Sequence, residues 1–453
     1  MRIQSLILKD FRRFENLRVD FDLDANDGGG LTLFVAPNGG GKTSILDAVN
    51  ISLGTFVGTM PNATGGVLKI SDQRTKLHDN QVSICGDVEI SATFIDESFE
   101  APVVIKRGFT ASKKRVATTT KDAKPLAQYA RKLLNETNQA STWPIVAYYG
   151  DSRLWAGERL TERRIAETLA MGRDFGYSDA VNPKSGYKEF SIWFPALEFA
   201  VFAEEQRRVM NDPGFDEKKA RRYRSQLEPI KEALRRALEP AGWREVVSDF
   251  AHGIWAIDTE RKTRIPIDSL SAGVKIVVGL VGDIAFRCAK LNPHLERDAL
   301  KETPGIVLID EVELHLHPAW QQVILPTLRS IFPRIQFIAT THSPQVVSSV
   351  PQKCVRILID DDVQEPFAQT QGVESQNALL EVFGVEPAPF SDPFVAKLRQ
   401  YDQMVQENQG ETESGKRLYQ ILSDHFGVNY PPLERIELFR RYATKRESGN
   451  NEE

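Results

Sequence analysis

Short apolar runs bounded by polar turns alternate with longer, charged, helix-like stretches along this chain. Residues 1–35 have the pattern of successive strands, with a polar, glycine-rich turn at residues 24–30 and a largely apolar run at Leu31–Val35. Such a run is typical of a strand that is buried on both faces of a sheet. Residues 88–94 alternate strictly between apolar and polar, which predicts a half-exposed antiparallel strand, and we expect residues 103–107 to pair with it.

The middle of the chain has a different character. Residues 122–238 are helix-like and charged, and they show no sustained heptad repeat, which favours a compact helical insertion over a long coiled-coil arm. Strand-like sequence resumes at residues 254–267, and two further buried strands are expected at residues 306–309 and 337–340. A last strand is predicted at residues 355–359, and the chain after it reads as helical.

Composition and charge limit the class of protein. The chain has 453 residues, 41% of them apolar, and a net charge of -5, without the overall basic excess of a typical stand-alone nucleic-acid binder. Its first apolar run is too short for a signal peptide, and no stretch approaches the roughly 18 apolar residues of a membrane helix. We therefore expect a cytoplasmic protein with no membrane contact. Cys85, Cys288 and Cys354 lack metal-ligand spacing, which favours small buried side chains in a reducing compartment.

A glycine-rich segment lies between the apolar strand that ends at Val35 and an apolar helix. A phosphate-binding loop requires this context, because glycine N–H groups turn inward around phosphates and the helix N-terminus adds its positive dipole end. The predicted ATP contacts are Asn38, Gly39, Gly40, Gly41, Lys42, Thr43 and Ser44. Lys42 is expected to reach the β- and γ-phosphates, and the Thr43 hydroxyl to bind Mg²⁺. Ala36 replaces the first glycine of the usual pattern, and we expect the loop to tolerate its methyl group.

Two carboxylates follow the buried strand that ends at Ile309. Asp310 is placed to bind Mg²⁺ directly or through water, and Glu311 is placed to polarise the attacking water as a general base. An Asp-Glu pair after a strand is common by chance. The upstream phosphate loop is what makes this pair informative.

Two weaker signals accompany these motifs. Leu270–Gly273 precedes an apolar helix and, taken alone, favours a simple N-capped helix. His342 follows the strand at residues 337–340, where it is placed to hydrogen-bond a γ-phosphate and sense its loss. A lone histidine is more often structural, and the position at a strand end is what favours the switch interpretation here.

Along the chain the four elements are the phosphate loop, Leu270–Gly273, the Asp310–Glu311 pair and His342. In this order they resemble the heads of ABC/SMC-like ATPases. They resemble more closely a shorter bacterial branch with Glu-x-His-Leu-His-Pro after the catalytic acid, here Glu313–Pro318, and Thr-His-Ser-Pro as the switch, here Thr341–Pro344. That branch includes RecF-like repair proteins, OLD nucleases, and ATPases of anti-phage systems such as PtuA of Septu and those of retrons. Lys9–Phe14 resembles the family's opening strand, whose basic residue approaches the nucleotide, a role that would fall to Arg12 and Arg13.

The resemblance implies an α/β fold: an ABC-ATPase-like head with a mixed sheet and a phosphate-loop helix, a helical insertion, and a helical C-terminal tail. The head would comprise residues 1–150 and 246–370, the insertion residues 151–245, and the tail residues 371–453. The tail is expected either to pack on the head or to contact a partner or another copy.

The same resemblance implies a homodimer, or a higher oligomer built from it. Two heads would enclose two ATP–Mg²⁺ units, each bound by the phosphate loop of one subunit and by Ser271 and Gly273 of the other. These two residues belong to the segment Leu270–Gly273, which resembles the ABC signature motif. Residues 148–155 resemble a segment of the defence members and carry no assigned role. The Q-loop glutamine stays open between Gln73 and Gln81.

Two functions follow from the resemblance. The first is a slow regulatory ATPase of an anti-phage complex that controls a separate HNH-type nuclease, and the alternative is a RecF-like clamp that grips DNA. An intrinsic nuclease is not expected, because residues 363–453 read as helical and Asp360–Asp362 is favoured as a solvated turn.

The basic run at residues 218–224 is either a solvated helix face or a nucleic-acid contact. A metal site at His315 and His317 is not favoured.

Overall fold

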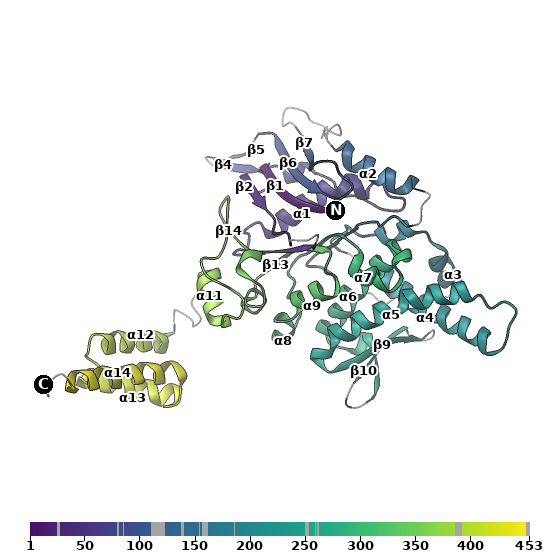
Figure 1. Cartoon of the computed structure of the whole chain (residues 1–453). Helices are drawn as coiled ribbons and strands as arrows, with labels where there is room; N and C mark the ends of the chain where they lie inside the picture. The colour runs from purple at the N-terminus through teal and green to yellow at the C-terminus, as the bar shows by residue number, and fades with distance from the viewer. Residues whose placement is uncertain are drawn as a thin grey trace. The chain divides into compact units, whose positions relative to one another are not determined.

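The computed structural model describes residues 1–24, 28–78, 81–84, 86–109, 123–136, 140–153, 155, 162–184, 186–249, 253–258, 260, 262–385 and 392–449. The chain divides into two compact units, Met1–Ala378 and Leu379–Glu453. Figure 1 shows the whole chain with most of its elements labelled. Cys85, expected to be a small buried side chain, lies outside the described residues.

A six-stranded sheet forms the centre of the larger unit. Its order is β15-β14-β3-β13-β12-β8, and all neighbouring pairs are parallel except β14 and β15. The strands are β3 (Gly30–Val35), β8 (Ile145–Tyr149), β12 (Gly305–Ile309), β13 (Ile335–Thr341), β14 (Val355–Ile359) and β15 (Asp362–Gln364). β3, β8, β12 and β13 are buried along their whole length, which is why their sequences are apolar runs without alternation.

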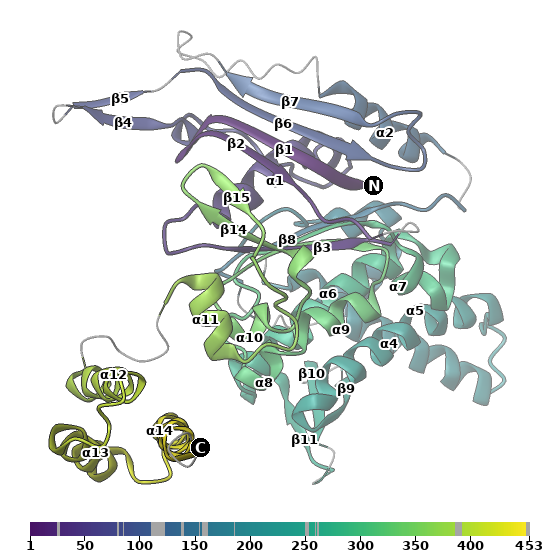
Figure 2. The same cartoon turned by 60° about the vertical axis from the view of Figure 1, so that its left-hand side comes forward.

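A second, antiparallel sheet of order β2-β1-β6-β7 covers one side of the first. Its strands are β1 (Arg2–Phe11), β2 (Phe14–Asp20), β6 (Val88–Ile95) and β7 (Val103–Phe109). β6 alternates between buried and half-buried residues and pairs with β7, which confirms both predictions made for these segments. Helix α1 (Lys42–Val57) lies between the two sheets and contacts β13 on one side and β6 and β7 on the other (Figure 2). β4 (Thr75–His78) and β5 (Gln81–Ile84) form a small hairpin.

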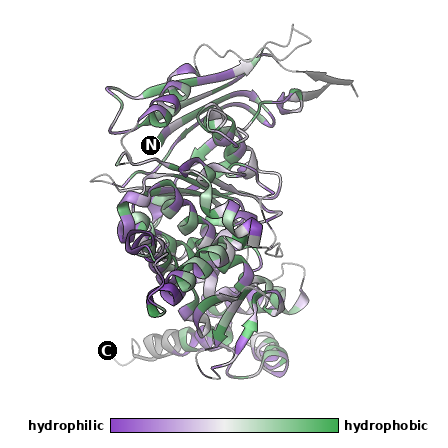
Figure 3. Cartoon of the chain, turned by 90° about the vertical axis from the view of Figure 1, so that its right-hand side faces the viewer, coloured by the Kyte–Doolittle hydropathy of each residue, from purple (hydrophilic) through white to green (hydrophobic). Residues whose placement is uncertain are grey.

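Helices cover the other face of the central sheet. Helix α6 (Ala272–Leu291) contacts β8 and packs against α4 (Lys188–Val209) and α5 (Glu217–Leu238). The shorter helices here are α3 (Glu162–Ala170), α7 (Ala299–Glu302), α8 (Pro318–Gln321), α9 (Ile324–Ile331) and α10 (Pro344–Val347). Helix α2 (Lys124–Asn135) lies instead against α1 and β7. In Figure 3 many helices carry green on one side and purple on the other, as amphipathic helices packed on a core do. β9 (Trp243–Asp249), β10 (Gly253–Asp258) and β11 (Arg264–Pro266) form a separate antiparallel sheet.

The expectation of a continuously helical stretch at residues 122–238 is wrong at one point. Ile145–Tyr149 is a strand, β8, at the edge of the central sheet beside β12. All five of its residues are buried. A five-residue apolar run has the same appearance in a buried strand and in a buried helix, so periodicity could not distinguish them.

The basic run at residues 218–224 lies on α5, and most of its charges are paired. Lys219 lies 3.4 Å from Glu204 and Arg221 lies 3.4 Å from Glu296, and Arg224 pairs with Glu205. The structure therefore favours the interpretation of this run as a charged helix face. The similar basic run at residues 113–115 lies outside the described residues.

The smaller unit is a bundle of three helices, α12 (Pro393–Gln406), α13 (Glu413–Phe426) and α14 (Pro431–Gly449). Tyr401, Val405, Leu422 and Leu433 form its core. A further helix, α11 (Ser375–Phe383), spans the boundary between the two units. This arrangement confirms the predicted helical tail. Across the described part of the chain, no helix combines the length and the apolar character needed to cross a membrane.

A fully buried ion pair within α6 is hydrogen-bonded to the central sheet. Arg287 Nε lies 2.7 Å from Asp283 Oδ2, and both side chains are 0% exposed. The Tyr149 hydroxyl at the end of β8 donates to the same carboxylate oxygen at 2.7 Å. Arg287 also donates to the carbonyl oxygens of Gly176 and Ser178, at 2.8 and 3.0 Å. The helix that begins with the predicted signature motif is thereby fixed to the strand beside β12.

We expect Asp283→Ala to lower the free energy of unfolding of the larger unit by about 3–5 kcal/mol, because it leaves the Arg287 charge buried without its partner. The double variant Asp283→Leu with Arg287→Met removes both charges and should recover much of that loss. Chemical denaturation monitored by tryptophan fluorescence measures both. An Asp283→Ala protein as stable as the wild type would contradict this assignment.

Candidate nucleotide site

The glycine-rich loop leaves β3 and enters α1 in the conformation that a phosphate loop needs. Gly41 caps α1 with φ 92°, and Gly39 has φ 74°, in the left-handed region that glycine adopts without strain. A Cβ atom at Gly40 would lie 2.5 Å from the Ala36 Cβ and 2.8 Å from the Pro37 carbonyl oxygen. The loop therefore accommodates Ala36 at its first position because Gly40 has no side chain.

Lys42 is the buried cation of the loop. It is 7% exposed, and its Nζ donates to the carbonyl oxygens of Ala36 at 2.8 Å and Pro37 at 3.4 Å. Burial lowers the pKa of Lys42, and the nearby carboxylates of Asp310, Glu311 and Glu313 partly oppose that shift. The ammonium group thus lies at the loop, in the field of the acids that follow β12.

Asp310 joins the phosphate loop to the neighbouring strand. Its Oδ2 accepts from the Thr43 hydroxyl at 2.8 Å, and its Oδ1 accepts from the Thr340 hydroxyl, at the end of β13, at 2.5 Å. Thr43 Oγ1 and the Asp310 carboxylate are the oxygen ligands that Mg²⁺ prefers, and Mg²⁺ sites commonly use only one or two protein groups. Among the described residues, no cluster of three or more His, Cys, Asp or Glu side chains is arranged to hold a metal ion.

Glu313 connects two segments at the sheet edge. One is the acid segment, residues 310–313 after β12, and the other is the switch segment, Thr341–Pro344 at the end of β13. Its Oε2 accepts from the Thr341 hydroxyl at 2.7 Å, and its Oε1 accepts from the His342 N–H at 2.5 Å. Glu311 lies between the two acids with a positive φ of 45°, and its N–H donates to the Thr340 hydroxyl at 2.7 Å. The structure therefore brings Asp310, Glu311 and the His342 segment together, as the sequence predicts. It also brings in Thr340 and Glu313, to which the sequence motifs assign no role of their own.

The two predicted arginines lie beside the loop in different ways. Arg12 is held by Asp47 at 2.6 Å and Asp72 at 3.0 Å, and its Nη1 lies 3.5 Å from the Ser44 hydroxyl. Arg13 is exposed and donates to the Gly39 carbonyl oxygen at 2.9 Å. Arg12 is thus committed to ion pairs next to α1, whereas Arg13 lies at the tip of the loop.

The predicted signature residues lie at the start of α6. Ser271 is the N-cap of α6, is exposed, and makes no side-chain cap hydrogen bond. Gly273 lies against the segment after Glu313: a Cβ atom there would be 2.8 Å from the His315 carbonyl oxygen. Within the described residues, no hydrogen bond or ion pair joins Ser271 or Gly273 to the phosphate loop of the same chain.

The remaining sequence candidates have structural contacts. His317 Nδ1 accepts from the Ala319 N–H and caps the short helix α8. Asp360 and Asp361 lie in the turn between β14 and β15, as expected for a solvated turn. Gln73 forms an isolated bridge with Phe11, and nothing in its described contacts assigns it to the nucleotide.

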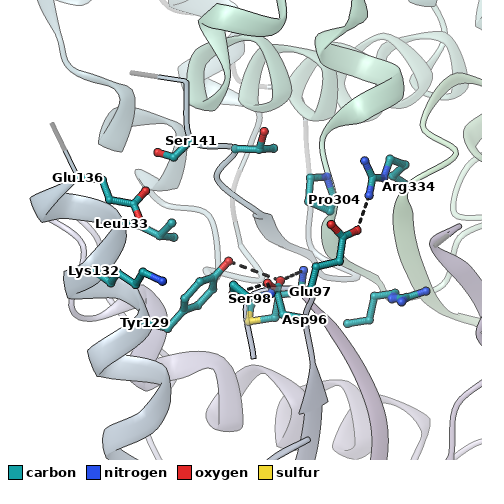
Figure 4. Close-up of a pocket in the computed structure, with 13 residues that line it drawn as sticks. Asp96, Glu97, Ser98, Tyr129, Lys132, Leu133, Glu136, Ser141, Pro304 and Arg334 are labelled. Atoms are coloured by element: carbon teal, nitrogen blue, oxygen red, sulfur yellow. Dashed lines mark hydrogen bonds and ion pairs between the residues drawn. The ribbon is translucent and has the colours of Figure 1, made fainter. Parts of the chain in front are cut away.

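Not every cavity involves the predicted site residues. One of about 280 Å³ includes Asp96, Tyr129 and Lys132, and an ion pair of 2.8 Å joins Arg334 to Glu97 at its side (Figure 4). None of the predicted site residues lines this cavity.

We expect Gly40→Ala to abolish ATP binding, because its methyl group has no room beside Ala36 and Pro37. Gly39→Ala is the matched control: its Cβ meets nothing within 4 Å, so only the cost of positive φ, on the order of 1 kcal/mol, applies. Titration with a fluorescent ATP analogue measures both affinities. Equal losses in the two variants would show that the packing of Gly40 on Ala36 is unimportant.

Sequence comparisons relate the chain to known ATPases. A family model described as an AAA domain matches residues 5–239, and a second AAA-domain model matches residues 154–348. The chain is 25% identical to the "Retron Ec83 probable ATPase" of Escherichia coli over 482 aligned positions, covering 97% of this chain and 86% of that protein. It is 25% identical to the "Retron Vc95 probable ATPase" of Vibrio cholerae serotype O1 biovar El Tor, covering 94% and 88%. A stretch of 110 positions is 37% identical to the Septu protein PtuA of Bacillus mycoides strain KBAB4, covering 24% of this chain and 14% of that protein.

Solved structures similar to the chain include SMC heads. The crystal structure of the Smc head bound to the C-winged helix domain of ScpA aligns with a TM-score of 0.46 and 16% identity, covering 82% of this chain and 99% of that chain. The SMC head domain from Thermotoga maritima aligns with a TM-score of 0.42 and 14% identity, covering 81% and 98%.

Proposed function

The chain belongs to the AAA-domain family and is an ATPase, and from that premise we propose that it is the ATP-dependent switch subunit of an anti-phage defence complex. The observation that carries the proposal is the junction of loop, acids and switch at one sheet edge. Thr43, Asp310 and Thr340 form one chain of hydrogen bonds there. Through such a junction, loss of the γ-phosphate would change contacts at the ends of β3, β12 and β13 together.

In this proposal the loop residues 38–44 bind the phosphates of ATP through N–H groups and the Lys42 ammonium. The Thr43 hydroxyl and the Asp310 carboxylate hold Mg²⁺, which neutralises charge on the phosphate oxygens. Glu311 accepts a proton from the attacking water, and His342 contacts the γ-phosphate and responds to its loss. Arg13, at the tip of the loop, is better placed than Arg12 to approach the nucleotide, because Arg12 is already paired with two aspartates.

The second half of each site comes from another copy of the chain. Ser271 is exposed at the start of α6, and its described contacts do not include the phosphate loop of its own chain. An N-cap serine without a cap hydrogen bond leaves its hydroxyl and the first N–H groups of α6 available for an anion. We infer that Ser271 and Gly273 bind the γ-phosphate held by a second subunit, so that ATP assembles a dimer and hydrolysis loosens it.

The partner in this proposal is a separate HNH-type nuclease that the ATP state restrains or activates. Support comes from the similarity to retron ATPases and to Septu PtuA and from the earlier resemblance to defence ATPases. A RecF-like clamp would require a basic face for duplex DNA. On α5, three of the five positive charges at residues 218–224 are engaged with glutamates, which favours the switch over the clamp.

We expect Glu311→Gln to lower kcat for ATP hydrolysis by about 10²–10⁴-fold while ATP remains bound, because the general base is lost and the phosphate contacts are kept. Light scattering with ATP should then show dimers that Ser271→Arg disrupts. Glu217→Gln, an exposed carboxylate at the start of α5, is the matched control and should behave as the wild type. A Glu311→Gln protein that stays monomeric with ATP would contradict the dimer mechanism.

The partner is tested by co-expression with any small HNH protein encoded by the adjacent gene. We expect the two proteins to purify together and the cleavage of plasmid DNA to differ with and without ATP, because the ATP state sets the assembly of the complex. The isolated ATPase should bind duplex DNA weakly. Strong, salt-sensitive and ATP-dependent DNA binding by the ATPase alone would instead favour the clamp.

A further inference from the structure

Arg153 is a fully buried arginine directed at the acid segment from a neighbouring strand. It lies four residues after the end of β8 and is 0% exposed. Its Nη1 donates to the carbonyl oxygens of Gly150, at 2.8 Å, and Asp310, and its Nη2 donates to the carbonyl oxygen of Glu311 at 2.7 Å. Among the described residues it has no ion-pair partner. Burying a guanidinium without a carboxylate partner is costly, and the three carbonyl oxygens are what offset it here.

These contacts fix the backbone on both sides of Glu311. The peptide unit before it is held at its oxygen by Arg153 and at its N–H by the Thr340 hydroxyl, at 2.7 Å. The peptide unit after it is held at its oxygen by Arg153 and at the Val312 N–H by the Thr340 carbonyl oxygen, at 3.0 Å. With both units held at both ends, the φ and ψ angles of Glu311 are determined.

The conformation that is held is one that glutamate does not favour. Glu311 has φ 45°, in the left-handed region, which costs a residue with a side chain on the order of 1–2 kcal/mol. Such a conformation persists only where the surroundings impose it. Arg153 supplies the contacts on the carbonyl side, and without them the peptide units are free to rotate towards a relaxed conformation that redirects the Glu311 side chain.

The segment that carries Arg153 is itself anchored at both ends. The Gly150 N–H donates to the Pro183 carbonyl oxygen at 3.0 Å, and a Cβ atom at Gly150 would lie 2.4 Å from that oxygen. Beyond Arg153, the Trp155 Nε1 donates to Asp268 Oδ1 at 2.9 Å, just before the exposed start of α6. The guanidinium is therefore held in place by contacts within the chain, which is the condition for a positioning role.

We propose that Arg153 is a positioning residue for ATP hydrolysis, which fixes the backbone of Glu311 so that its carboxylate faces the attacking water. This inference rests on the proposed role of Glu311 as general base. It assigns a role to the segment at residues 148–155, which the sequence left without one. Arg153 contacts main-chain oxygens of the acid segment, so it acts through Glu311.

The test compares Arg153→Ala and Arg153→Lys with the wild type. We expect Arg153→Ala to lower kcat by about 10–100-fold, as misplacement of a catalytic group by about 1 Å does, while KM and the affinity for ATP change less than threefold. Lysine carries one ammonium group and cannot span both carbonyl oxygens, so Arg153→Lys should recover only part of kcat.

Hydrogen exchange gives a readout that needs no catalysis. In the nucleotide-free protein, the amides of Glu311 and Val312 should exchange faster in Arg153→Ala than in the wild type. Arg173→Ala is the matched control, because Arg173 donates to the carbonyl oxygens of Leu291 and Ser141, both at 2.6 Å, away from the acid segment. In Arg173→Ala, the exchange rates of the Glu311 and Val312 amides and kcat should equal those of the wild type.

The outcomes separate the two proposals. If the Glu311→Gln variant has the kcat of the wild type, the general-base role is wrong, and Arg153 then has no catalytic group to position. If Glu311→Gln reduces kcat and Arg153→Ala does not, the positioning role is wrong. Loss of ATP affinity in proportion to kcat, or unchanged exchange of the Glu311 and Val312 amides in a folded Arg153→Ala protein, would show that Arg153 does not position Glu311.

Discussion

Parallel strands of one sheet end at the same edge, and the chemistry of this protein depends on that constraint. β3, β13 and β12 are neighbours in the central sheet, so the phosphate loop, the switch segment and the acid pair all begin at the carboxyl ends of adjacent strands. Thr43 and Asp310 are 267 positions apart in sequence, yet Thr43 Oγ1 lies 2.8 Å from Asp310 Oδ2 in the structure. Because the strands are buried on both faces, the apolar core that stabilises the sheet also fixes the distances between the motifs.

Hydroxyl groups connect these three strand ends. Thr43 and Thr340 donate to the two oxygens of Asp310, and Thr340 also accepts from the N–H of Glu311. A carboxylate that accepts two hydroxyl hydrogen bonds has a fixed orientation, and charge-assisted bonds of this kind are stronger than those between neutral groups. The switch segment has an equivalent connection through Glu313. A change at the phosphate site therefore reaches the neighbouring strands through short, directional contacts.

The helices on the far face of the sheet extend these connections to the signature segment. Asp283 and Arg287 on α6 are buried against Tyr149 of β8, and β8 lies beside β12. The same helix begins at Ser271, and Gly273 lies against the backbone after the acid pair. In the proposed mechanism, the motif that would contact one nucleotide and the motif that would contact a second are thus parts of one packed body. Packed interfaces move between discrete arrangements more readily than they deform, which suits a switch.

The sequence by itself determined the features that depend on local chemistry. Burial on both faces requires continuous apolar runs, so β3, β12 and β13 were predictable, and a phosphate loop requires glycines before Lys42 and Thr43. It also indicated the helical tail and the turn at Asp360. It did not reveal β8, whose five apolar residues have no period that separates a strand from a helix.

Only the tertiary structure decided how side chains meet the backbone of distant segments. Arg153 donates to carbonyl oxygens more than 150 positions away, and Arg12, 3.5 Å from the Ser44 hydroxyl, is held beside the loop by Asp47 and Asp72. Strand order sets these contacts, and hydrophobic periodicity carries no information about strand order. A single arginine in the sequence therefore gives no sign of which backbone it will hold.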